Sequence, residues 1–111
     1  MKDDRIYLFH IRDGLDRIER YLKKGKDNFF ADTMVQDAVI RNLQTMAESS
    51  RYLSDSIKKS YPEADWKNIS GFRNVLVHDY LGLDLNQIWD IVEKDLPPLR
   101  KIIDKIIKEL K

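Results

Sequence analysis

The chain has 111 residues, of which 42% are hydrophobic and 35% are charged. This length suits one domain with one hydrophobic core, so we expect a single domain over residues 1–111 and not a multidomain enzyme. The longest apolar runs, such as residues 6–9 and 75–77, are far shorter than the roughly 20 residues that span a bilayer, so no transmembrane helix is expected. The first residues also lack the uninterrupted apolar stretch of a secretory signal.

Charge and cysteine content narrow the class of protein further. The 20 basic and 19 acidic residues leave a net charge of +1, which gives no reason to expect a simple basic surface for nucleic acid. The absence of cysteine excludes disulfides and thiolate metal sites. It also fits a reducing compartment, so we expect a cytoplasmic protein.

The hydrophobic pattern predicts a first helix that begins at Asp3 or Asp4 and ends at Gly25. Residues 26–31 are predicted as a connection in which Phe29 and Phe30 fold back on the core. The apolar residues of the helix recur at spacings of three and four, which places them on one face. They are Leu8, Ile11, Leu15, Ile18 and Leu22.

A second helix is predicted from Asp32 or Thr33 to near Tyr61, because the same spacing continues and Pro62 disfavours helical geometry in the residue before it. Small residues such as Ala38 and Ala47 lie on or beside its apolar stripe. They allow another helix to approach closely, either within the chain or from a second copy.

Two more helices follow in the pattern. One is predicted over residues 66–80, with a possible break at Ser70 and Gly71, because a glycine inside a helix costs about 1 kcal/mol relative to alanine; Gly82 ends it. The other covers residues 85–110, with a kink or restart at Pro97 and Pro98. No stretch alternates in the manner of a strand. The predicted fold class is therefore all-α, with the architecture of a four-helix up-and-down bundle.

Most catalytic templates are absent from the sequence, including phosphate-binding glycine loops, metalloprotease motifs and nucleophile elbows. His10 lies beside the apolar stripe of the first helix and is interpreted as an ordinary surface or boundary residue. A metal site would need both histidines together with carboxylates from different helices, so we expect neither a metal nor a cofactor.

Reactive side chains are concentrated between Gly71 and Tyr80. On a regular helix Asn74 and His78 share a face, whereas Arg73 and His78 point about 140° apart, so guanidinium and imidazole converge poorly. Two arrangements bring them together. Either the helix ends near His78 and the ring swings back, or the same segment of a second copy faces this one across a two-fold axis.

The second arrangement gives a shared cleft that suits phosphoryl transfer on RNA. An imidazole takes a proton from the ribose 2′-hydroxyl or gives one to the leaving 5′-oxygen, and a guanidinium holds the phosphate as negative charge builds. Neither step needs a metal. A structural interpretation is equally open from these residues, in which His78 caps the end of its helix and Arg73 pairs with an acid.

The segment from Arg73 to Tyr80 matches the R-x4-H-x-Y motif of HEPN-superfamily proteins. The chain resembles a HepT-like toxin of the type VII HepT/MntA toxin–antitoxin system over nearly its whole length. Outside the motif, the resemblance rests on three further parts of the chain. These are residues 36–43 with Ala47 and Glu48, Trp66 with residues 69–72, and residues 84–89 with 95–97.

This resemblance implies a four-helix protein that forms a homodimer in which the two motifs meet, and that cleaves RNA, either tRNA or mRNA, without a metal. It implies that Arg73 neutralises the scissile phosphate and that His78 is the general acid or base. It also implies that Asn74 orients the phosphate or His78. It further implies that a cognate MntA-like nucleotidyltransferase antitoxin transfers AMP to Tyr80, where added phosphates would repel the RNA backbone. Glu48 resembles a family glutamate to which we assign no role.

Two other functions remain consistent with the sequence. The first is a catalytically silent module that binds a nucleotide or docks a nucleotidyltransferase, which the near-neutral net charge favours. The second is a structural helical adaptor, for which substitutions over residues 73–80 would change only the stability of the protein.

Overall fold

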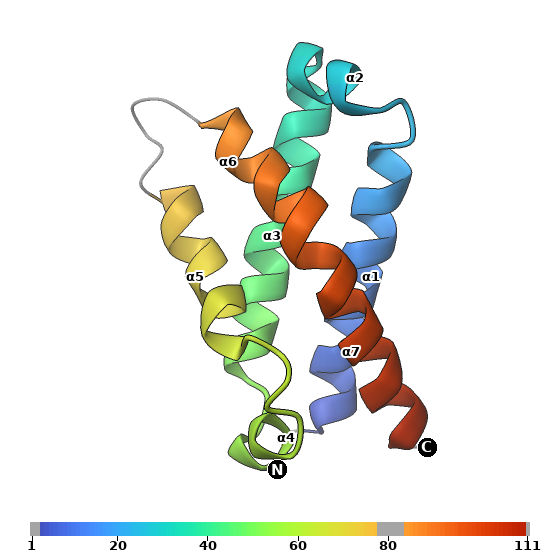
Figure 1. Ribbon diagram of the computed structural model, residues 1–111, viewed down its shortest axis with the longest axis vertical. Helices are drawn as coiled ribbons and strands as arrows, with labels where there is room; N and C mark the ends of the chain where they lie inside the picture. Colours follow the sequence, from blue (N-terminus) through green and yellow to red (C-terminus); the bar gives the residue numbers. More distant parts are fainter. Residues whose placement is uncertain (1–2, 78–83, 111) are drawn as a thin grey trace.

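The computed structural model describes residues 3–77 and 84–110, with side chains placed for residues 3–72 and 84–110. Every regular element in these ranges is helical, which confirms the all-α class (Figure 1). The elements are α1 (Asp4–Tyr21), α2 (Lys26–Ala31), α3 (Thr33–Arg51), α4 (Asp55–Ser60), α5 (Trp66–Val77), α6 (Leu85–Asp90), the π-helical turn η2 (Ile91–Asp95) and α7 (Leu96–Glu109).

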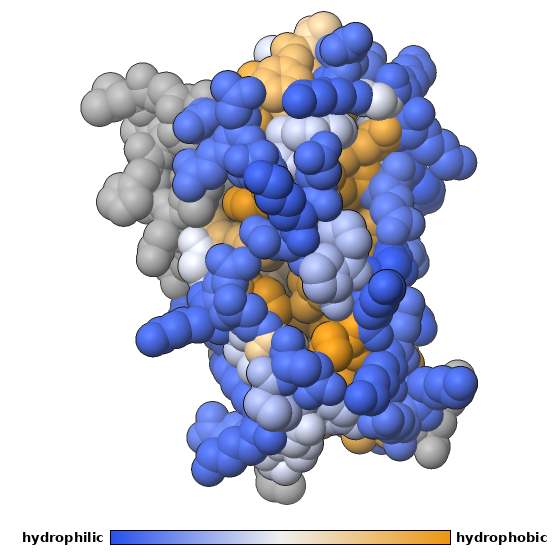
Figure 2. Space-filling model, in the orientation of Figure 1, coloured by the Kyte–Doolittle hydropathy of each residue, from blue (hydrophilic) through white to orange (hydrophobic). Residues whose placement is uncertain are grey.

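Four long units form the bundle. Helices α1, α3, α5 and the rod made of α6, η2 and α7 alternate in direction along the long axis, as the up-and-down prediction requires (Figure 1). Figure 2 shows a largely hydrophilic face on which hydrophobic side chains appear in the seams between helices. The core between the helices includes Leu8, Ile11, Val39, Leu43, Met46, Ile88, Ile103 and Ile106, all fully buried.

Helix α1 begins where the sequence predicted but ends earlier. The Asp3 carboxylate accepts a hydrogen bond from the Arg5 N–H at 3.0 Å and so caps the first turn. The helix ends at Tyr21 and not at Gly25, which instead precedes α2 with a φ of +91°. This left-handed conformation is the reason for a glycine there. Residues 26–31 are a short helix and not the predicted connection, and Phe29 is fully buried as expected.

The predicted second helix is divided into α3 and α4. The division follows from Ser54, whose hydroxyl accepts from the Ile57 N–H at 3.2 Å and starts a new helix. The Ser54 N–H donates to the Asp4 carboxylate of α1 at 2.8 Å instead of to a carbonyl of α3. A long-range contact therefore overrides the continuous helical pattern.

Helix α5 runs unbroken through Ser70 and Gly71, so the break considered at this point is absent. Ile69 and Phe72 are buried and fix the helix against α3. The predicted continuation to residue 80 and the stop at Gly82 lie outside the described residues.

The interruption expected near the two prolines is a π-helical turn directly before them. Prolines have no N–H, so Pro97 and Pro98 cannot donate to the carbonyls one turn earlier. The Leu96 N–H donates to the Ile91 carbonyl, five residues back, which widens the helix at this turn. The rod therefore continues into α7 without separating.

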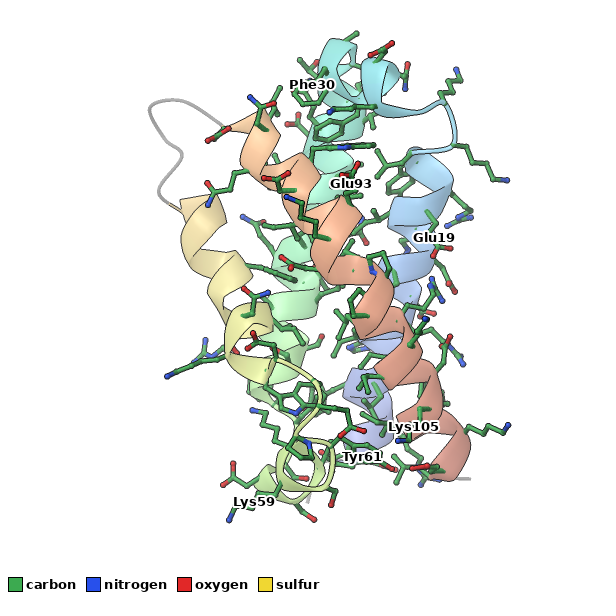
Figure 3. All side chains as sticks on the ribbon, viewed as in Figure 1. Glu19, Phe30, Lys59, Tyr61, Glu93 and Lys105 are labelled. Atoms are coloured by element: carbon green, nitrogen blue, oxygen red, sulfur yellow. The ribbon has the colours of Figure 1, made fainter. Side chains whose placement is uncertain are left out.

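Arg100 ties α7 to α1. Its guanidinium donates to Asp16 at 2.6 Å and to Glu19 at 2.7 Å, and Figure 3 labels Glu19 on this side of the bundle. Partial burial lowers the pKa of Arg100, but the two carboxylates outweigh it and the pKa is raised overall. The contact holds α7 against α1.

Candidate functional site

The R-x4-H-x-Y segment starts in the last turns of α5 and runs into residues 78–83, which connect α5 to α6. The start of α5 is fixed by Asp65, whose carboxylate accepts from the Asn68 N–H at 3.0 Å. Phe72, only 2% exposed, anchors the helix immediately before the motif. The backbone at Arg73 and Asn74 is therefore held by the core.

Helix α6 provides the other fixed end of this connection. Its first turn is capped by Asp84, which accepts from the Gln87 N–H at 3.2 Å. Behind it Trp89 packs on Phe29 with ring centroids 5.4 Å apart and on Phe30 at 6.4 Å; Figure 3 labels Phe30 at this end of the bundle. Residues 78–83 thus lie between two helices that pack on the core, α5 through Phe72 and α6 through Ile88.

The four predicted site residues lie partly outside the part of the chain that the structure describes. Arg73 and Asn74 lie in α5, but their side chains lie outside the part of the chain that the structure describes. His78 and Tyr80 lie outside the described residues. The convergence of Arg73 and His78 on one phosphodiester therefore stays a prediction.

A hollow of about 450 Å³ lies elsewhere on the surface, between α1 and α3. His10 borders it with an exposed side chain, in agreement with its interpretation as a surface residue. Glu48 also borders it and pairs with Arg51 at 3.5 Å. Sequence reasoning did not find this hollow, because its walls come from residues more than thirty positions apart and no local pattern joins them.

Among residues 3–77 and 84–110, no three histidine or acidic side chains gather closely enough to hold a metal ion. Within the same ranges no helix is both long and apolar enough to cross a membrane.

Comparison with known proteins identifies the family. The profile of the family described as "Ribonuclease HepT-like" matches residues 11–106. The chain therefore belongs to the HepT-like ribonuclease family of the HEPN superfamily. No solved structure matches the chain.

Three relatives illustrate the similarity. A "Probable ribonuclease HepT" of Thermococcus cleftensis is 31% identical over 92% of this chain and 94% of its own length. "Putative RNase MJ1380" of Methanocaldococcus jannaschii is 32% identical over 93% of this chain and 95% of its own length. A "Gamma-glutamylcyclotransferase and putative RNase" of the same organism is 39% identical over 98% of this chain, which spans only 50% of that relative.

Proposed function

We propose that the chain is an endoribonuclease toxin that acts as a homodimer. The observation that carries this proposal is the family match over residues 11–106 together with the intact motif from Arg73 to Tyr80. The motif begins in the last turns of α5, and Phe72 directly before it is buried, so the bundle supports the start of the proposed site.

The proposed reaction uses the substrate's own nucleophile. The ribose 2′-oxygen attacks the phosphorus, the bond from phosphorus to the 5′-oxygen breaks, and the products are a 2′,3′-cyclic phosphate and a 5′-hydroxyl. His78 removes the 2′-hydroxyl proton or protonates the 5′-oxygen. Arg73 stabilises the charge that builds on the phosphate oxygens, and Asn74 orients the phosphate or the imidazole.

Helical geometry favours a dimer. Arg73 lies on the α-helical part of the motif, and a regular continuation would direct His78 about 140° away from it. A two-fold axis beside this segment places Arg73 of one copy near His78 of the other. Each dimer then holds two equivalent composite sites.

We infer that modification of Tyr80 regulates the same site. A cognate nucleotidyltransferase antitoxin transfers AMP from ATP to the Tyr80 hydroxyl, which loses its proton, and pyrophosphate leaves. The transfer adds a phosphate beside the site. Its negative charge repels the RNA backbone and pairs with Arg73.

RNA cleavage by the purified protein tests this function. We expect the wild type to cut single-stranded RNA with and without EDTA, and His78→Ala and Arg73→Ala to lose at least about a hundredfold in rate, as expected on removal of a general acid–base or a phosphate-stabilising group. Unchanged cutting by either variant would reject the proposed site. Absence of cutting by the wild type, with growth unaffected on expression of the chain alone, would favour the silent binding module.

A further inference from the structure

The hollow between α1 and α3 has aromatic side chains at one end. The ring of Tyr7 stacks on that of Tyr52 with centroids 5.4 Å apart and an interplanar angle of 23°. His10 meets Tyr7 edge-on at 6.3 Å. Tyr52 is 50% exposed, so much of this aromatic surface faces solvent. Exposed aromatic rings of this kind stack with unpaired nucleobases.

Polar side chains of α3 form the adjoining wall of the hollow. Arg41, Gln44 and Thr45 line it together with Glu48. The guanidinium of Arg41 suits a phosphate, and the amide of Gln44 both donates and accepts hydrogen bonds, as the edge of a nucleobase requires. The hollow therefore combines a stacking surface with groups for a base edge and a phosphate.

The same wall argues against a protein helix as the occupant. A helix that docks in a groove needs apolar anchors opposite its own apolar face. The α3 wall is instead formed by polar side chains, and two of them, Glu48 and Ser49, are of types that are depleted at protein interfaces. The larger exposed apolar residues of α1, Ile6 and Phe9, do not line the hollow.

Helix α3 borders the hollow and also packs against α5, the helix in which the motif begins. One wall extends from Arg41 of α3 to Tyr52, the residue directly after that helix, a length of about 16 Å at the helical rise. The same helix packs against both α1 and α5 (Figure 1), and α5 carries the start of the motif. A single RNA strand lying in the hollow thus contacts the helix that supports the proposed cleavage site.

We propose that the hollow between α1 and α3 binds an unpaired nucleotide of RNA, with its base against Tyr7 and Tyr52 and its phosphate toward Arg41. This inference rests on the proposed ribonuclease function and specifies how its substrate is held. Recognition is for an exposed base and not for a duplex, in which the bases are stacked on one another.

The test is binding of a fluorescent single-stranded RNA in which every 2′-hydroxyl is methylated, so that it cannot be cut by 2′-oxygen attack. Fluorescence anisotropy with the full chain measures the affinity. We expect Tyr52→Ala to weaken binding roughly tenfold, within the range of one base stacked on an aromatic ring. We expect Tyr52→Phe, which keeps the ring, to bind within about twofold of wild type.

Two arginine variants provide the matched comparison. Arg41→Ala should weaken binding severalfold and reduce its dependence on salt, because one phosphate contact is lost. Arg17→Ala removes an exposed arginine of α1 that does not line the hollow, and its affinity should stay at the wild-type value. Both arginines are exposed helical residues, so Arg41→Ala remains informative even where Tyr52→Ala does not fold.

Parallel measurements separate this inference from the proposed function. Wild-type affinity in both Tyr52→Ala and Arg41→Ala overturns the nucleotide site, whether or not the wild type cuts ordinary RNA. Loss of binding in these variants supports it, even if ordinary RNA is not cut, in which case the ribonuclease proposal alone fails. If light scattering shows that Tyr52→Ala separates a dimer, the hollow is an interface between proteins and the inference is wrong.

Discussion

Gly14 of α1 faces Met46 of α3 at a contact where no side chain would fit. A Cβ atom placed on Gly14 would lie 2.7 Å from Met46 Cγ and 2.9 Å from Met46 Sδ. Met46 is fully buried, so its side chain has little room to withdraw. This contact sets the distance between the two helices that form the hollow.

Gly14→Ala should therefore destabilise the protein. Overpacking in a core costs about 1–3 kcal/mol, and the better helix propensity of alanine returns up to about 1 kcal/mol. We expect a net loss of about 1 kcal/mol in the free energy of unfolding, measured with urea.

Gly71→Ala is the matched control, because Gly71 is also inside a helix but a Cβ there meets open space. We expect it to stabilise the protein by about 0.5–1 kcal/mol. In a Met46→Ala background, Gly14→Ala should become stabilising as well. An equal cost of Gly14→Ala in both backgrounds would show that the contact with Met46 is not responsible.

Asp4 joins the start of α1 to the start of α4. Its carboxylate accepts from the Ser54 N–H at 2.8 Å and from the Ser54 hydroxyl at 2.7 Å, in a half-buried position. Asp4→Ala leaves both donors without this acceptor and should cost about 1–3 kcal/mol in urea unfolding. Asp13→Ala, an exposed change on the same helix, should stay within about 0.5 kcal/mol of wild type. Equal effects of the two changes would contradict this role of Asp4.

The hydrogen bond between Tyr61 and Glu109 should be lost at alkaline pH, which would lower the stability of the protein. The Tyr61 hydroxyl donates to the Glu109 carboxylate at 2.5 Å, and this hydrogen bond raises the pKa of Tyr61 above its ordinary value of 10.0. Figure 3 shows Tyr61 beside Lys105, whose ammonium lies 5.9 Å from the tyrosine ring. The pKa of Tyr61 is raised only in the folded state. The hydrogen bond to Glu109 therefore stabilises the folded protein fully below pH 10, and this stabilisation is lost as the pH rises through the raised pKa.

Urea midpoints across this alkaline range measure the effect. The urea midpoint should fall more steeply with rising pH in wild type than in Tyr61→Phe, which lacks the titrating hydroxyl. Tyr21→Phe removes a different hydroxyl and should keep the wild-type slope. A Tyr61→Phe protein that declines as steeply as wild type would exclude this hydrogen bond as the cause.

Co-expression with a cognate nucleotidyltransferase tests the proposed regulation. We expect a peptide that contains Tyr80 to gain the mass of one AMP, and the modified protein to lose RNA cleavage because of the added negative charge. Tyr80→Phe should carry no adduct and should escape inhibition by the transferase. An unmodified Tyr80 peptide in a protein that is nevertheless inhibited would remove this claim.

The core and the order of the helices could be predicted from sequence because apolar spacing directly specifies which side of a helix is buried. Leu8, Ile11, Leu15 and Ile18 all lie in the core. The break between α3 and α4 could not be predicted, since it depends on the Asp4 carboxylate, which is 50 positions from Ser54 in sequence. The hollow was missed for the same reason.

The sequence predicts the residues of the candidate site but not how they come together. Local spacing along α5 indicates which motif residues share a face and which diverge. Whether Arg73 and His78 act together depends on contacts between two copies, and helical spacing within one chain does not determine these contacts.

Mixing two inactive variants tests the composite site most directly. Arg73→Ala and His78→Ala dimers should each fail to cut RNA. After subunit exchange, half of the dimers contain one copy of each variant and one of their two sites is intact, so about a quarter of the wild-type rate should return. A mixture that stays inactive, although light scattering and tagged subunits show that mixed dimers form, would contradict a site shared between two copies.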